Sequence, residues 1–150
     1  MAYEHKISDL KFRINKLIPQ DKCKFLINIF EKYKDLSHSE KSYKVKKICP
    51  FFNDAYINSS SNIRILKYEM GQSIIDHSDV DYRTRASCTL NLNEDYEGGE
   101  FRFFNGQIKE SFKTGDAILF PAEPIWIHGT EPIIKGTRYA INCFLHMNEN

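Results

Sequence analysis

The feature that most constrains the fold is a run of short stretches after residue 62 that are rich in β-branched and aromatic residues. Turn-forming pairs such as Gly98-Gly99 and Asn105-Gly106 separate these stretches. Short strands at this spacing predict an antiparallel sandwich or barrel. In chain order the predicted strands are IRILKYEM, ASCTLNLN, EFRFFNG, GDAILFPA, PIWIH and TRYAINCFLH.

The first third of the chain predicts a different kind of structure. The alternation of Leu10, Phe12 and Ile14 is typical of a strand. A helix is predicted next, because apolar residues recur every three or four positions and share one core-facing side: Cys23, Leu26, Ile29, Phe30 and Tyr33. Residues 35–62 are polar and irregular and predict loops around a short element. We therefore expect one domain over residues 1–150, in which a strand, helix and loop buttress (1–62) packs on a β-core (63–150).

The composition excludes several classes of protein. With 41% hydrophobic and 27% charged residues, the 150-residue chain has the balance of a globular domain. No apolar run approaches the roughly 18 residues of a membrane span, and the polar N-terminus lacks a secretory signal. The four cysteines lie far apart, which indicates reduced thiols rather than disulfides or a zinc cluster: Cys23, Cys49, Cys88 and Cys143. We expect a cytoplasmic protein that makes no membrane contact.

Charge is unevenly spread along the chain. Residues 1–50 carry 12 Lys and Arg against 6 Asp and Glu, whereas residues 51–150 carry 9 against 14. A solvated, lysine-rich surface is the simpler explanation, and a basic patch that attracts an acidic partner stays open as the alternative. The basic tract KSYKVKK is too short to indicate a nucleic-acid partner, so none is expected.

His77 and Asp79 stand one residue apart just before a predicted strand. Side chains at i and i+2 of a strand point to the same face, so an imidazole and a carboxylate would project together, as a metal site requires. The pair alone is weak evidence in a chain with five histidines and 20 acidic residues. Asp76 would point to the opposite face and Asp81 lies past the strand end, so Asp79 is the favoured ligand. The remaining histidines have no partner at a meaningful spacing: His5, His38 and His146.

Two later residues complete a candidate site. His128 lies 49 residues after Asp79, near the end of another predicted strand. Two histidines and one carboxylate form the facial triad that holds Fe(II) with coordination positions left open. Arg138 could reach the same cavity from the next strand, where a buried guanidinium would need a ligand's carboxylate as partner. Zinc also accepts such ligands together with a water, but a zinc hydrolase has no need for that arginine.

The order and spacing of these motifs resemble the catalytic domain of the prolyl 4-hydroxylase-like Fe(II)/2-oxoglutarate-dependent dioxygenases. The resemblance covers about residues 63–146 and rests on YEMGQSIIDHSD, TLNLNEDYEGGEFRFF, GDAILFP, the histidine at 128 and KGTRYAI. The segment FRINKLIPQDKCKFLINIF is similar to that family's N-terminal lead-in. The resemblance implies a mainly β fold with N-terminal helices, a double-stranded β-helix or jelly roll. It also implies that His77, Asp79 and His128 bind iron and that Arg138 pairs with the distal carboxylate of 2-oxoglutarate.

Further site residues are suggested with less specificity. Tyr68 matches a tyrosine that lines the site in relatives, whereas Asn91 stands where some relatives have a tyrosine that contacts 2-oxoglutarate. By strand alternation Thr89 and Asn142 also point to the cavity. Three residues are weaker substrate candidates, although a core tryptophan and solvated loop arginines are the commoner cases: Trp126, Arg83 and Arg85.

The expected function is an oxygenase that uses Fe(II), O2 and 2-oxoglutarate to hydroxylate a C–H bond, with ascorbate as a further candidate cofactor. By resemblance the substrate is a prolyl residue of a peptide or protein. The competing hypotheses are a hydroxylase of a lysyl residue or a free amino acid, a zinc-binding hydrolase, and a non-catalytic jelly-roll binding module. A peptide would be held by residues 71–87 and by loops at residues 38–62, whose basic side chains are Lys41, Lys44, Lys46 and Lys47.

Overall fold

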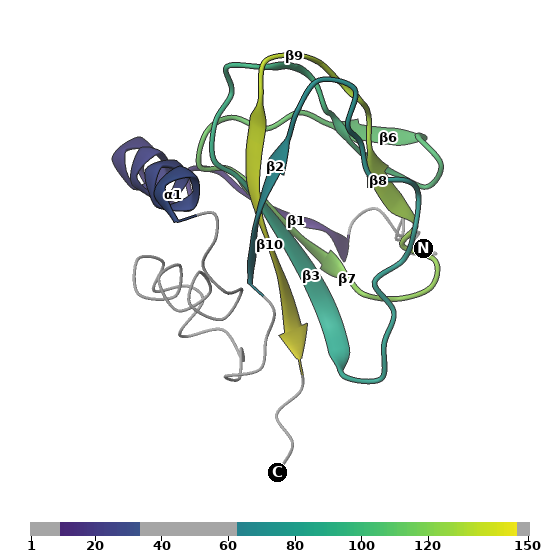
Figure 1. The fold of residues 1–150 in the computed structure, drawn as a ribbon. Helices are drawn as coiled ribbons and strands as arrows, with labels where there is room; N and C mark the ends of the chain where they lie inside the picture. The colour runs from purple at the N-terminus through teal and green to yellow at the C-terminus, as the bar shows by residue number, and fades with distance from the viewer. Residues whose placement is uncertain (1–9, 34–62, 147–150) are drawn as a thin grey trace, which may run out of the picture.

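The computed structural model describes residues 10–33 and 63–146 (Figure 1). Within these ranges one helix precedes most of the strands, as the sequence predicted. The elements are β1 (Phe12–Ile14), α1 (Gln20–Lys32), β2 (Arg64–Tyr68), β3 (Thr84–Asn91), β4 (Glu97–Gly98), β5 (Phe101–Phe103), β6 (Ile108–Glu110), β7 (Ala117–Pro121), β8 (His128–Thr130), β9 (Ile133–Lys135) and β10 (Arg138–His146).

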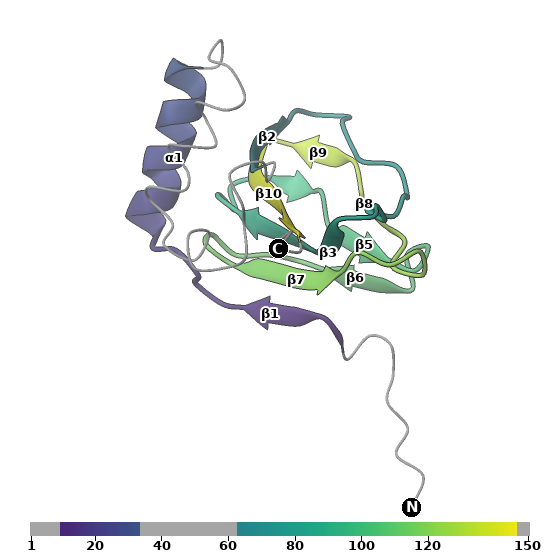
Figure 2. The same cartoon turned by 90° about the horizontal axis from the view of Figure 1, so that it is seen from below.

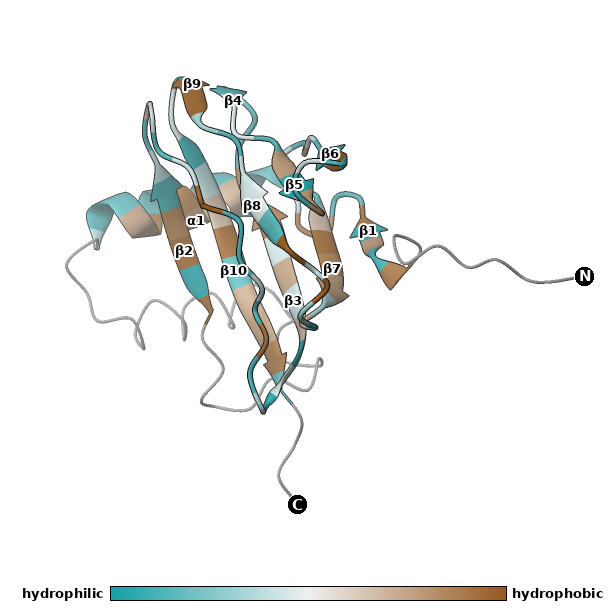
Figure 3. Ribbon diagram, turned by 90° about the vertical axis from the view of Figure 1, so that its right-hand side faces the viewer, coloured by the Kyte–Doolittle hydropathy of each residue, from teal (hydrophilic) through white to brown (hydrophobic). Residues whose placement is uncertain are grey.

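The strands form one large antiparallel sheet and two small ones. The large sheet has the order β1-β7-β3-β10-β2, so strands that are distant in sequence lie side by side. The small sheets are β6-β5-β8 and the pair β4-β9. Helix α1 lies on one side of the large sheet, and the small sheets lie on the other (Figures 2 and 3).

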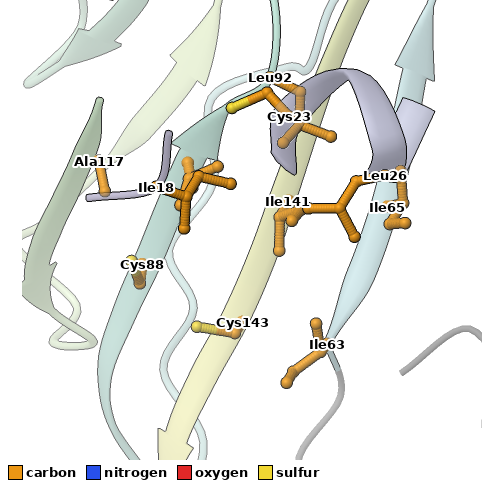
Figure 4. Packing of buried hydrophobic residues seen from close by; sticks show 11 residues of the cluster. Ile18, Cys23, Leu26, Ile63, Ile65, Cys88, Leu92, Ala117, Ile141 and Cys143 are labelled. Carbon is orange, nitrogen blue, oxygen red and sulfur yellow. The ribbon is translucent and has the colours of Figure 1, made fainter. Parts of the chain in front are cut away.

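The two faces of the large sheet have different chemistry because successive side chains alternate between them. On β3, the face toward the helix carries Cys88 and Leu90, which belong with Leu92, just after the strand, to the apolar core packed around α1 (Figure 4). The opposite face of the same strand carries three buried polar residues: Ser87, Thr89 and Asn91. Burial of polar groups is costly unless they are hydrogen-bonded, so this inner face is where a functional site is expected.

Helix α1 covers the apolar face of the large sheet. Its side chains Cys23 and Leu26 are completely buried and pack on Ile141 of β10 and Ile65 of β2. Burial, together with the nearby charge of Asp21, raises the pKa of the Cys23 thiol to about 11. The thiol is therefore protonated at neutral pH and serves as a small core residue, as the sequence predicted.

Asp116 joins the N-terminal strand to the β-core. Its carboxylate accepts hydrogen bonds from the Lys16 backbone N–H (3.0 Å), the Arg13 guanidinium (2.9 Å) and the Lys113 backbone N–H (3.1 Å). Burial alone would raise the pKa of this carboxyl group, but these bonds outweigh burial and hold the pKa below its usual value. The charged form of Asp116 therefore stabilises the attachment of β1.

Several expectations can be compared with these elements. The predicted strands are confirmed, except that PIWIH lies mostly in a turn and His128 begins strand β8 instead of ending one. Three of the cysteines are free and buried: Cys23, Cys88 and Cys143. Cys49, His5, His38, the predicted loops at 35–62 and their lysines lie outside the described residues. In the part of the chain that is described, no helix has the length and apolar character needed to span a membrane.

Candidate active site

A single β-bridge brings the two histidines together. His77 and His128 exchange both backbone hydrogen bonds, at 2.9 and 2.8 Å, although 51 positions separate them in the chain. The imidazole rings consequently lie 4.4 Å apart between centroids. Asp79 follows His77 in an extended loop rather than in a strand, so the strand argument for this pair was wrong although the side chains do converge.

Both imidazoles are oriented by their own backbone. Nδ1 of His77 lies 2.8 Å from the carbonyl oxygen of Ile75, and Nδ1 of His128 lies 2.9 Å from that of Trp126. A carbonyl oxygen can only accept, so each Nδ1 carries a proton and Nε2 is the ring nitrogen left to bind a metal. A hydrogen bond of this kind fixes the tautomer and the ring plane of a metal-binding histidine.

The Asp79 carboxylate faces both free nitrogens. Oδ1 lies 3.4 Å from Nε2 of His77, and Oδ2 lies 3.2 Å from Nε2 of His128. Burial would raise the pKa of Asp79, but its contacts with His128 and then His77 outweigh that effect and hold the pKa well below its usual range. One ligand atom from each of the three residues lies within 4.8 Å of the others, which places two imidazole nitrogens and one carboxylate oxygen around one point.

The surroundings of the three side chains are rigid and apolar. The His128 ring is buried, stacks on Phe101 at 5.4 Å and meets the edge of Phe120 at 4.8 Å. On the opposite side, the Asp76 carboxylate accepts a hydrogen bond from Nε of Arg102 at 2.8 Å, and Arg102 also donates to the carbonyl of Thr130. This ion pair ties the loop before His77 to strand β8. The partner of Asp76 is therefore Arg102, in keeping with the expectation that Asp76 points to the opposite face from His77.

Strand β10 places Arg138 on the same inner face as Asn142, four residues away and about 13 Å along the strand. The Arg138 side chain is 1% exposed, and its Nε donates to Oδ1 of Asn91 at 3.1 Å. The guanidinium also lies 5.4 Å from the ring of Tyr68 and 5.9 Å from that of Phe112. Its Nη2 is buried and has no hydrogen-bond partner among the described residues. An unpaired donor on a buried cation is costly, so it calls for an anionic partner.

A cavity of about 250 Å³ opens beside the three metal-binding candidates. Leu66 and Ile74 line this cavity and also pack on the apolar cluster around Tyr68 and Ala140. Arg138 itself does not line the cavity and lies deeper in the fold, next to that cluster. Arg138 therefore does not reach into the cavity directly, although the sequence had suggested that it would. The side chains of Leu66 and Ile74 form the wall that connects the cavity with the region around Arg138.

The weaker candidates on β3 and β10 have clear structural partners. Thr89 donates from its hydroxyl to Oδ1 of Asn142 at 2.8 Å, and Asn142 lines the cavity. Asn91 accepts from Tyr96 at 3.2 Å as well as from Arg138, and its own amide donates to the backbone of Asn93. Asn91 thus holds the arginine in place.

The three weak substrate candidates do not line the cavity. Trp126 is 2% exposed and packs in an aromatic cluster with Phe103 and Phe120, so the core interpretation describes it better. Arg85 is exposed and donates to the carbonyl of Thr84, and Arg83 lies beside Tyr82. Asp81, the rejected ligand candidate, accepts instead from the Arg83 backbone and the Thr84 hydroxyl.

Sequence reasoning missed much of the cavity wall. The missed lining residues are Arg64, Leu66, Ile74, Phe101, Gly129 and Phe144. Two of them had a detectable signal, because Arg64 and Leu66 precede Tyr68 by four and two positions and must share its face of the strand. Phe101 and Phe144 looked like ordinary core residues, and no local pattern distinguishes a cavity wall from a core.

A match to a family model identifies the class of protein in which this site occurs. The model of the 2OG-Fe(II) oxygenase superfamily matches residues 63–146, which contain all three metal-binding candidates and Arg138. The chain belongs to this superfamily. Fe(II) is the cofactor of these oxygenases, and 2-oxoglutarate and O2 are their cosubstrates. The donor set around Asp79 and the unpaired Nη2 of Arg138 fit such a metal and such an anion.

Curated relatives match about half of the chain. A PKHD-type hydroxylase from Synechococcus sp. (strain JA-2-3B'a(2-13)) is 37% identical over 53% of this chain and 40% of its own length. Another from Janthinobacterium sp. (strain Marseille) is 40% identical over 43% of this chain and 29% of its own length. The chain thus spans less than half the length of these relatives.

Solved structures confirm the jelly-roll fold of the oxygenase domain. A viral collagen prolyl hydroxylase from Paramecium Bursaria Chlorella virus-1, in a 2-oxoglutarate complex, matches with a TM-score of 0.66 and 19% identity over 93% of this chain and 97% of its own. A Pseudomonas putida prolyl-4-hydroxylase matches at 0.66 and 16% identity, over 100% and 97%. A Trichoplax adhaerens prolyl hydroxylase bound to a hypoxia inducible factor peptide fragment matches at 0.67 and 14% identity, over 93% and 84%.

Proposed function

We propose that the chain is a 2-oxoglutarate-dependent hydroxylase that acts on prolyl residues of peptides or proteins. The observation that carries the proposal is the combination of a preset ligand group, His77, Asp79 and His128, with a buried, incompletely paired Arg138 on the inner face of the large sheet. A zinc hydrolase or a passive binding module would need the ligand group but not the arginine. The comparisons do not favour either alternative.

In this proposal three side chains hold Fe(II). His77 and His128 would donate through Nε2, since each Nδ1 is already committed to a carbonyl oxygen. Asp79 would supply the anionic oxygen and would exchange its present contacts with the imidazoles for the metal. Three ligands on one side of the ion leave the other side open, as a facial triad requires.

Arg138 would bind the far carboxylate of 2-oxoglutarate. The free Nη2 supplies the donor, while the bond from Nε to Asn91 and the flanking Tyr68 and Phe112 rings prevent the guanidinium from rotating away. A dicarboxylate with one end at the metal and the other at Arg138 would lie along the wall of Leu66 and Ile74. This wall is apolar and would exclude water from the bound cosubstrate.

Once bound, Fe(II), 2-oxoglutarate and O2 supply the oxidation that converts a substrate C–H to C–OH with release of succinate and CO2. The protein contributes by orienting the metal-binding side chains and by excluding water from the site. Phe101, which stacks on the His128 ring, and Phe120, which meets it edge to face, fix that ring, and the Asp76–Arg102 ion pair fixes the loop that carries His77. A substrate residue would enter the cavity against Leu66, Phe101 and Phe144.

The substrate class is proposed from the names of structural neighbours, which include prolyl hydroxylases and one complex with a peptide. It is tested by incubating the iron-loaded protein with 2-oxoglutarate and proline-containing peptides. We expect peptide-dependent succinate release and a mass gain of one oxygen atom on proline. Peptides in which alanine replaces proline serve as the control and are expected to give succinate only at the peptide-free rate.

Two outcomes would change the proposal. Oxidation of free proline or lysine without any peptide turnover would identify a small-molecule hydroxylase with the same iron chemistry. Oxidation of a lysyl residue in place of proline would redefine the target. Ascorbate dependence is a prediction that the same assay tests, by omission of ascorbate from the reaction.

A further inference from the structure

Arg64 is a wall residue of the cavity that the metal-binding group does not use. It begins strand β2 and pairs directly with Asn142 of β10. Neighbouring residues of β2 alternate, with Ile65 in the core beside α1 and Leu66 in the cavity wall. Arg64 therefore lies on the same inner face as Leu66, at the exposed mouth of the cavity that His77 and His128 line.

The other five arginines of the chain all have polar or ring partners. Arg13 pairs with Glu110 and Asp116, Arg102 with Asp76 and Glu131, and Arg138 with Asn91. Arg85 donates to a carbonyl, and Arg83 contacts a tyrosine ring. Among the described residues, the Arg64 side chain makes no hydrogen bond, ion pair or ring contact. Its guanidinium is available to a ligand.

A second donor lies directly beside Arg64. The Oδ1 atom of Asn142 is occupied by the Thr89 hydroxyl, which leaves the Nδ2 amide of Asn142 without a hydrogen bond to any residue that the structure describes. The cavity wall here therefore offers a guanidinium and an amide, both of them donors. Among the described residues that line the cavity, only Asp79 of the metal-binding group has a carboxylate. Such a pair suits an anion with two oxygens.

The rest of the cavity is small and apolar. Leu66, Ile74, Phe101 and Phe144 supply most of the remaining side-chain surface. A volume of about 250 Å³ is below the roughly 300–1,000 Å³ of pockets that enclose a drug-sized ligand, so it suits one amino-acid side chain. This apolar cavity, with the unpaired Arg64 guanidinium at its mouth, suits a substrate in which an aliphatic side chain lies next to a carboxylate.

We infer that Arg64 is a specificity-determining residue that binds a carboxylate of the substrate adjacent to the hydroxylated residue. The inference rests on the proposed function and deepens it, because it names the chemistry that accompanies the target. The carboxylate comes from a neighbouring Glu or Asp side chain of a peptide or from the free carboxyl group of an amino acid. Arg138 keeps the cosubstrate, and Arg64 selects the substrate.

The test compares matched substrates on matched variants. The substrates are a peptide with one proline and Glu, Gln or Lys at each neighbouring position, and free proline against prolinamide. The variants are R64Q, R64K and R64E, with Lys113→Gln as a control that removes an exposed positive charge away from the cavity. Binding is measured by fluorescence anisotropy of labelled peptides on anaerobic Fe(II)- and 2-oxoglutarate-loaded protein. Turnover is measured separately as succinate release, and 2-oxoglutarate affinity is measured on every variant.

We expect wild-type protein to prefer the Glu peptide over the Gln peptide by roughly tenfold or more, as one charge-assisted pair allows. R64Q should remove the preference, R64K should keep part of it, and R64E should transfer it to the Lys peptide. Lys113→Gln should keep the wild-type preference, and every variant should bind 2-oxoglutarate as wild type does. If only the proline and prolinamide pair responds to Arg64, the inference holds with a free amino acid as the source of the carboxylate.

Two results would overturn the inference. R64Q with an undiminished preference for the acidic substrate would show that another group reads the carboxylate. Weakened 2-oxoglutarate binding in R64Q would make Arg64 part of the cosubstrate site. Because binding is measured without turnover, an Arg64-dependent preference with no oxidation of any substrate would defeat the proposed function while leaving this assignment intact.

Discussion

Replacement of Asn91 by leucine is expected to destabilise the fold and loosen Arg138. Leucine has a similarly branched side chain but cannot accept the hydrogen bond from Nε of Arg138, at a site where Asn91 is only 1% exposed. A lost hydrogen bond to a buried charged group costs about 1.5–3 kcal/mol. Tyr96 and the Asn93 carbonyl lose a partner as well, which adds about 1–2 kcal/mol. The free energy of unfolding should therefore fall by roughly 3–5 kcal/mol.

This loss is measured by urea unfolding and by the thermal midpoint, which should fall by roughly 6–20 °C for a chain of this size. Asn91→Asp is the matched variant, because it keeps an acceptor for Arg138 and Tyr96. We expect it to be the more stable of the two variants and yet to bind 2-oxoglutarate weakly, since the new carboxylate competes for the guanidinium. If the free energy of unfolding of Asn91→Leu falls by less than about 1 kcal/mol, the idea that Asn91 holds Arg138 in place is refuted.

Three further predictions follow from the site and its supports. Arg138→Met should weaken 2-oxoglutarate binding by roughly 2–5 kcal/mol in calorimetry while metal content stays at the wild-type level, and unchanged affinity would remove Arg138 from the cosubstrate site. Asp79→Ala should abolish iron retention in elemental analysis, whereas Asp81→Ala should keep it; the reverse pattern would reassign the ligand. Asp116→Asn should lower the free energy of unfolding by about 1–2 kcal/mol at pH 7. Because the folded pKa of Asp116 is depressed, its stabilisation is complete above the unfolded pKa of about 4 and is lost as the pH falls through the folded value. The free energies of unfolding of wild type and Asp116→Asn should therefore converge as the pH falls. A difference between them that stays constant down to low pH would contradict the stabilising role of the Asp116 carboxylate.

Local patterns in the sequence were enough to predict the sheet and the ligand types. Alternation along β3 separates Cys88 and Leu90 from Thr89 and Asn91, and the structure places these two pairs on opposite faces. The identity of His77, Asp79 and His128 as a group followed from residue type and from family resemblance. Their convergence depends on long-range pairing.

The contacts that make the site work could not be predicted from local patterns. The bridge between His77 and His128 joins a loop to a strand that begins 51 positions later, and only the folded topology brings them together. The bond between Asn91 and Arg138 likewise depends on the register of β3 against β10. Arg64 was overlooked because a charged residue at the start of a strand looks like solvated surface until the cavity beside it is known.

The claim that these residues form an Fe(II) and 2-oxoglutarate site is tested most directly by anaerobic titration of the protein with Fe(II) and then 2-oxoglutarate. Chelation of the metal by the keto acid gives a visible charge-transfer absorption that neither component shows alone. We predict that the band appears with one equivalent of Fe(II), saturates with 2-oxoglutarate, and is absent from the Asp79→Ala variant. Tight stoichiometric iron binding with no band at saturating 2-oxoglutarate would contradict the account.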